Sequence, residues 1–150
     1  MAITQAIANS FKKLLLEGDQ NFKASGGDVF KIALFTSSAT MNSQTTAYST
    51  SNEVSNSGQY TAGGGKLVNA GTAIGSGTGK GVATVDFNDR SFTGVTLTAR
   101  GALIYNTSST TTNAAVAVLD FGGDKTATSG TFTIQFPAAT TAAAILRISG

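Results

Sequence analysis

The first residues of the chain carry apolar side chains at helical spacing. They recur at intervals of four, four and three positions, and they are Ile3, Ile7, Phe11 and Leu14. On a helix this spacing gives one apolar stripe. Thr4 can cap its start, and Gly18 is a natural stop. The pattern predicts a helix over about residues 3–17, with its stripe packed on a β core or, alternatively, turned toward a partner.

The rest of the chain contains short apolar runs separated by turn residues. The runs predict strands at residues 29–35, 66–72, 81–87, 91–97, 99–106, 114–121, 131–136 and 143–148. Glycine, asparagine and aspartate fill the predicted turns, at residues 75–81, 88–90, 106–113 and 122–124. About seven to eight short strands at this spacing predict a mainly β protein, an antiparallel sandwich or barrel with an N-terminal helix.

Residues 36–66 show no apolar period and consist largely of serine, threonine, asparagine and glycine around Tyr48, Val54 and Tyr60. An irregular stretch of about 30 residues in a compact domain is usually a functional loop or hides a short strand. We expect it to lie on the surface, pinned by the two tyrosines, and to contact a neighbouring subunit. Together with Phe11 of the helix, should its stripe face a partner, the predicted interface residues are Phe11, Tyr48, Val54 and Tyr60. The expected organisation is one domain over residues 1–150, with the β core at about 66–148.

Two predicted strands are apolar on both faces, at residues 102–105 and 116–119. Such strands are central ones, covered by the opposing sheet on one side and by the helix or a partner on the other. If they pair through a hairpin at residues 106–113, Arg100 and Asp120 can meet. We expect that ion pair to be structural.

The chain has no histidine and no cysteine. A Ser-His-Asp or Cys-His arrangement cannot be drawn, and the best zinc ligands are missing. The glycine-rich run at 75–81 lacks the residues of a phosphate-binding loop and predicts a hairpin loop. Asp120 and Asp124 are too few for calcium, and Asp86 with Asp89 lacks the stacking aromatics of a glycosidase cleft. We expect no enzyme, no cofactor and no metal.

Charge is sparse, with 10 Lys and Arg against 8 Asp and Glu, together 12% of the chain. That is about half the usual share. Only Lys12 and Lys13 are adjacent basic residues, so we expect no nucleic-acid binding. No apolar stretch approaches the roughly 20 residues of a membrane span, and no signal peptide is expected. A surface of Ser, Thr, Asn and Gly costs little to dehydrate and suits an assembly; it also fits a plain threonine-rich β domain.

Several stretches are familiar in combination. They are MAITQAI (1–7), SFK (10–12), FKIAL (30–34), TSSAT (36–40), TAY (46–48), NEV (52–54), YTAGG (60–64), TARGALIYN (98–106), AVAVLDFG (115–122) and FTIQFP (132–137). Together they resemble a family of small virion structural proteins of tailed bacteriophages. The resemblance runs nearly end to end, and it brings no catalytic motif with it.

The resemblance implies a protein made in the host cytoplasm and assembled into the virion. Our first expectation is a capsid decoration (cement) protein, a homotrimer whose partners are sister subunits and the major capsid protein. A tail, neck or fibre-base component is the first alternative. A carbohydrate-binding module on the particle surface is the second, and it would need exposed aromatic side chains, for which Tyr48 and Tyr60 are the loop candidates.

Overall fold

The computed structural model describes residues 2–75, 81–140 and 143–149. Within them the chain is mainly β with one short helix. Its elements are β1 (Ala6–Ile7), α1 (Asn9–Leu16), β2 (Phe30–Phe35), β3 (Gly65–Lys66), β4 (Asn69–Ile74), β5 (Val82–Phe87), β6 (Arg90–Asn106), β7 (Ala114–Ile134) and β8 (Leu146–Ser149).

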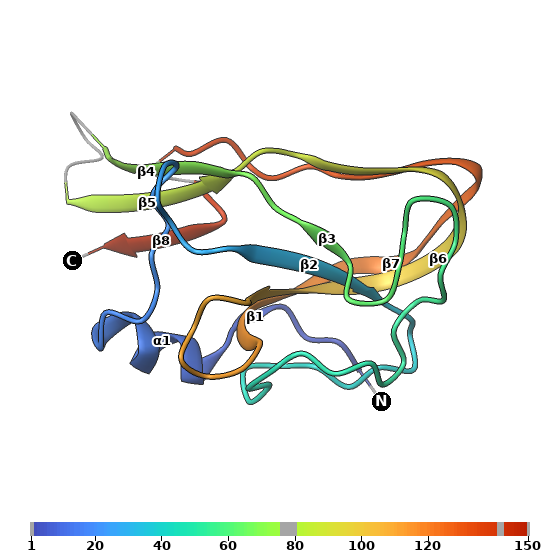
Figure 1. Cartoon of the computed structure of the whole chain (residues 1–150), viewed down its shortest axis with the longest axis horizontal. Helices are drawn as coiled ribbons and strands as arrows, with labels where there is room; N and C mark the ends of the chain where they lie inside the picture. The colour runs from blue at the N-terminus through green and yellow to red at the C-terminus, as the bar shows by residue number, and fades with distance from the viewer. Residues whose placement is uncertain (1, 76–80, 141–142, 150) are drawn as a thin grey trace.

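The strands form two antiparallel sheets, one with the order β1-β7-β6-β2-β3 and one with the order β4-β5-β8. Figure 1 shows them as two layers, with α1 beside β8 and below the three-stranded sheet. The prediction of a mainly β, antiparallel fold with an N-terminal helix is confirmed. Because both sheets are open, the fold is a sandwich and not a barrel.

The two longest strands, β6 and β7, form a long ribbon within the five-stranded sheet. They pair from Asn106 with Ala114 to Arg90 with Ile134. Figure 1 shows the ribbon bending so that its outer half returns over the five-stranded sheet. Each of them was predicted as two strands, and that prediction is wrong. The expected turn at residues 122–124 is instead an irregularity inside β7, where Gly122 has φ +77°.

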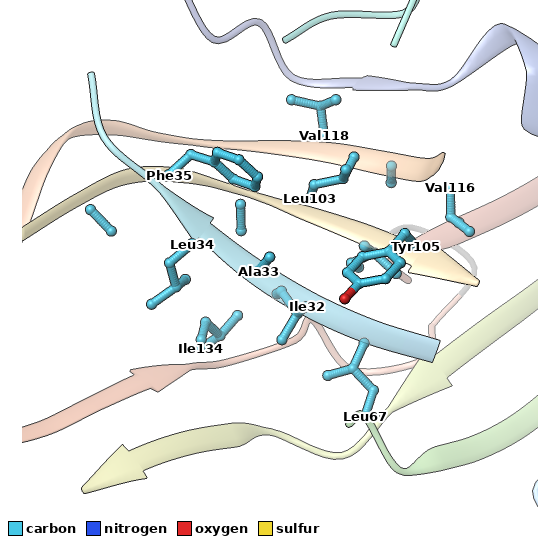
Figure 2. Close-up of a cluster of buried hydrophobic side chains, with 14 of the residues drawn as sticks. Ile32, Ala33, Leu34, Phe35, Leu67, Leu103, Tyr105, Val116, Val118 and Ile134 are labelled. Atoms are coloured by element: carbon cyan, nitrogen blue, oxygen red, sulfur yellow. The ribbon is translucent and has the colours of Figure 1, made fainter. Parts of the chain in front are cut away.

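The central part of the five-stranded sheet, formed by β2 and the inner halves of β6 and β7, is buried on both faces, as predicted for the central strands. Figure 2 shows Ile32 and Leu34 on the side of Ile134 and Leu67, while Leu103 and Val118 point to the opposite side. Other fully buried members of the core are Phe30, Ile104, Val116 and Tyr60. The outer face of this sheet is covered by α1, by the N-terminal segment and by the long polar loop, which passes beneath the sheet in Figure 1.

The helix begins at Asn9 and not near residue 3, which corrects the predicted start. The residues before it are extended: Ile3 forms a bridge with Met41, and Ala6 and Ile7 pair with β7. Ala8 takes the N-cap position without a side-chain cap, so Thr4 has no capping role. Sheet hydrogen bonds satisfy this backbone in place of a helix.

The helix ends at the glycine that the sequence predicts. Gly18 has φ +79°, and its N–H donates to the Leu15 carbonyl oxygen while the Asp19 N–H donates to the Leu14 carbonyl oxygen. These two bonds satisfy carbonyl groups that the last helical turn leaves open. The predicted stop is confirmed.

Strands β4 and β5 form the predicted hairpin, closed by a bond from the Gly75 N–H to the Val82 carbonyl oxygen. Residues 76–80 of the glycine-rich run lie outside the described residues. The last strand starts at Leu146, three residues later than predicted. Within the described parts of the chain, no helix has the length and apolar character to cross a membrane.

Candidate assembly surfaces

The long polar loop is fixed to the sheet by one carboxylate. Glu53 accepts hydrogen bonds from the Tyr48 hydroxyl at 2.6 Å, the Tyr60 hydroxyl at 2.7 Å and the Gly63 N–H at 2.8 Å. The Leu34 N–H of β2 donates to the Tyr60 hydroxyl oxygen at 2.7 Å. Glu53 thus joins three points of the loop, and Tyr60 connects them to the sheet.

The same tyrosines pack against aromatic rings of the sheet. Tyr48 stacks on Tyr105 with centroids 4.6 Å apart, and Tyr60 meets Phe92 edge-on at 5.0 Å. Burial raises the pKa of Tyr105 to about 12. Burial, with the nearby Glu53 carboxylate, also raises the pKa values of Tyr48 and Tyr60. The phenols therefore stay protonated and able to donate well above neutral pH.

The structure places the four predicted interface residues inside the chain's own packing. Phe11, Val54 and Tyr60 are 3%, 5% and 0% exposed, and Tyr48 is half-buried. The loop is pinned by both tyrosines, as predicted, but the pinning side chains face the sheet. A partner would meet other residues first. A carbohydrate site would need exposed rings, and Tyr60 does not offer one.

A second feature is an exposed array of hydroxyl groups on the outer half of the β6–β7 ribbon, which we call the hydroxyl face. It consists of exposed side chains that alternate with buried ones, and its members are Ser91, Thr93, Thr96, Thr98, Thr126, Thr128, Thr131 and Thr133. Residues 91–98 and 126–133 contain no charged side chain. The face is the solvent-exposed side of the outer half of the ribbon, and its side chains are uncharged.

Some of these hydroxyl groups are bonded across the ribbon. Ser91 and Thr133 are opposite each other with their hydroxyl oxygens 2.8 Å apart, and Thr98 and Thr126 form a second such pair at 2.8 Å. Pairing of this kind holds the side chains in place. The sequence signal is the alternation of Ser and Thr with apolar residues, but the turn predicted at 122–124 divided the strand and hid the continuous face.

A third feature is a groove of about 430 Å³ between α1 and the three-stranded sheet. Its apolar walls come from Phe11, Leu15, Val85, Leu146 and Ile148. Three basic side chains also line it, those of Lys12, Lys23 and Arg147. These residues come from distant parts of the sequence, so sequence reasoning did not find the groove.

The predicted ion pair of Arg100 and Asp120 is present, with Nε and Oδ1 3.3 Å apart. Asp120 also accepts the Gly122 N–H at 2.9 Å, and this bond, followed by the Arg100 contacts, lowers the pKa of the carboxyl. Asp89 accepts the Phe136 N–H and so anchors the end of β7. Among the described residues, no three His, Cys, Asp or Glu side chains group closely enough to hold a metal ion.

Comparison of the chain with models of protein families, with curated proteins and with solved structures returns no match. We therefore infer function from the surfaces that this chain itself presents. Of these, the Glu53 network is internal, whereas the hydroxyl face and the groove are open to a partner.

Proposed function

We propose that this chain is a structural protein of a tailed-phage particle, and within it a capsid decoration (cement) protein that binds and stabilises the head shell. Its partners are the major capsid protein and sister subunits, arranged as a trimer. The observation that carries the proposal is the hydroxyl face. The sequence resemblance to small virion structural proteins points in the same direction.

The hydroxyl face suits a role in covering another surface. Ser and Thr hydroxyl groups cost less to remove from water than charged groups, which need a matched opposite charge when they are buried. Short side chains that are already bonded across the ribbon lose little rotamer freedom on binding. The face therefore supports contact with a neighbour over a broad area without requiring precise charge pairs.

The pinned loop supports the same proposal in another way. Glu53 and its tyrosines hold residues 48–63 against β2, so the loop presents a fixed outer surface. Rigid surfaces pay less ordering entropy when they assemble. A protein with two ordered, weakly charged surfaces is suited to repetitive packing.

The test is the number of copies of the chain per finished particle, measured by quantitative mass spectrometry against the major capsid protein. A cement protein is present in many copies, in a fixed ratio to the major capsid protein. A small, symmetry-limited number would support the tail, neck or fibre-base alternative and contradict the cement role. Absence from finished particles would overturn the whole proposal.

A matched measurement tests stabilisation. Particles produced without the chain should release their DNA at a lower temperature than complete particles, and addition of purified chain should restore the original temperature. Unchanged release temperatures would contradict a stabilising role.

A further inference from the structure

We propose that a second copy of this chain pairs with the free edge of β7, antiparallel to it and across a two-fold axis at Thr133. The inference deepens the proposed function, and it rests on that function only for the place of the two copies in a particle. It names the contact between sister subunits: a sheet that continues from one copy into the next.

The free edge of β7 is the first observation. In the described residues, β6 pairs with one side of β7, while β1 covers the other side only at Ala117 and Val118. Pairing with β6 is regular at residues 132–134, near the end of the ribbon. Residues 126–136 contain no charged side chain and no proline, the devices with which edge strands commonly discourage association. This edge is therefore suited to pairing with another strand.

A hollow of about 400 Å³ lies beside this edge. Its described lining residues all come from residues 121–135, and none comes from β6. Thr133 reaches the hollow from the hydroxyl face, and Phe132 and Ile134 reach it from the face that packs in the core. Because the hollow meets both faces of one strand and no residue of the neighbouring strand, it lies along the free edge. An added strand has room there.

The sequence of this edge fits a second copy of itself. Residues 131–135 alternate exposed Thr or Gln with Phe132 and Ile134, which are 8% and 6% exposed. In an antiparallel pair centred on Thr133, Phe132 of one copy is opposite Ile134 of the other, on the same face. These side chains would cover each other beside Phe121, whose ring lies 6.0 Å from that of Phe132 between centroids. Cross-strand contacts of this kind stabilise a sheet.

The absence of charge favours a second copy as the partner. A two-fold axis brings like charges together wherever an edge strand is charged, whereas residues 126–136 carry none, so two copies meet here without repulsion. Side chains directly opposite each other in antiparallel strands lie on the same face, so the two hydroxyl faces join into one surface. A contact of this symmetry closes on two copies and can connect one trimer to the next.

The test is disulfide cross-linking of the purified full chain, which has no cysteine of its own. Thr133→Cys places two thiols opposite each other, with Cα atoms within the roughly 4.4–6.8 Å that a disulfide needs. Ser91→Cys is the matched control, because Ser91 is the hydroxyl partner of Thr133 on β6 and both variants lose the same bond. Copies of residue 91 would be three strand spacings apart, about 14 Å. Mild oxidation should cross-link Thr133→Cys about tenfold faster than Ser91→Cys.

A mixture of two further variants tests the register. Residues 131 and 135 are both exposed, and in the proposed pair each is opposite the other residue of the second copy. Thr131→Cys mixed with Gln135→Cys should therefore give a mixed disulfide quickly. Either variant alone places its two thiols about four residues apart along the strands, roughly 13 Å, and should cross-link at the rate of the Ser91→Cys control.

Equal rates for Thr133→Cys and Ser91→Cys would overturn the inference, and so would a mixture that cross-links no faster than its two components. A disulfide from residue 133 to another protein in particles, in place of linked copies, would also overturn it, since another chain would then occupy the edge. Copy number in particles is measured separately. A chain that is abundant in particles but does not cross-link removes this inference alone, whereas cross-linking by a chain absent from particles removes the proposed function.

Discussion

Among single residues, Glu53 contributes most to the position of the polar loop, because its carboxylate accepts hydrogen bonds from two phenols and a backbone N–H. Glu53→Gln replaces one acceptor oxygen with a donor and removes the charge. We expect the free energy of unfolding to fall by about 1–3 kcal/mol, because buried donors lose their partner. Urea denaturation followed by circular dichroism measures it.

Glu17→Gln is the control for that change. Glu17 pairs with Lys13 on the exposed side of α1 at 2.8 Å, and loss of such a surface pair costs about 0.5 kcal/mol or less. Equal effects of the two substitutions would contradict the role assigned to the Glu53 network.

Gly64, in the same loop region, is needed for a close approach of two backbone segments. Gly64 has φ +76°, and an added Cβ would overlap the Ile32 carbonyl oxygen of the neighbouring strand. Gly64→Ala should therefore cost about 3 kcal/mol or more, from left-handed strain plus displacement of β3 from β2. Gly122→Ala is the matched control: it has φ +77° and open space around it, so only about 1–2 kcal/mol of strain is expected. Thermal unfolding of both variants tests the difference.

At the level of elements, α1 is held by its apolar stripe. Phe11 is 3% exposed and meets the Phe22 ring edge-on, with centroids 5.9 Å apart. Phe11→Ala should cost about 3–5 kcal/mol, because it leaves a cavity in the core. Leu16, 89% exposed on the same helix, gives the control: Leu16→Ala should change stability by less than about 0.5 kcal/mol. Normal stability of the Phe11 variant with failed assembly would instead place the residue at an interface.

The start of α1 shows why one prediction from the sequence failed. Ile3 and Ile7 are four positions apart, and that spacing puts two side chains on one face of a helix and equally on one face of a strand. Periodicity alone therefore cannot choose between them. Pairing of Ala6 and Ile7 with β7 decides for the extended backbone, and this partner is more than a hundred residues away in the sequence.

The central strands were predictable from their pattern and from the turn residues around them. Residues 102–105 and 116–119 are short runs that are apolar throughout, which is typical of a strand covered on both faces. The length of β7 was not predictable, because Gly122 and Gly123 have the composition of a turn. Continued pairing with β6 keeps them inside the ribbon. The Ser and Thr surface was anticipated from composition, but its place on the ribbon, and the groove, depend on contacts between distant segments.

At the scale of the whole molecule, the polar loop covers the sheet, whereas other surfaces of the molecule are presented to neighbours. The aromatic residues of the loop point inward and help to cover one face of the five-stranded sheet. From the sequence alone, a partner was one of the possible covers of this face. The outward surfaces carry Ser and Thr on the ribbon and basic side chains at the groove. What the described part of the chain offers to neighbours is therefore surface of two distinct chemistries.

The claim that the hydroxyl face makes the contact with the particle is tested most directly by rebinding. The measurement is binding of purified chain to particles that lack it, for the unmodified chain and for Thr98→Lys combined with Thr126→Lys. These two residues are opposite each other at one end of the face, so two charges enter the face at a stability cost of about 1 kcal/mol or less. Thr111→Lys combined with Thr112→Lys, on the exposed hairpin between β6 and β7, adds the same charge elsewhere. We predict that the first variant folds but does not bind, while the hairpin variant binds like the unmodified chain. Full binding by the Thr98 and Thr126 variant would contradict the account.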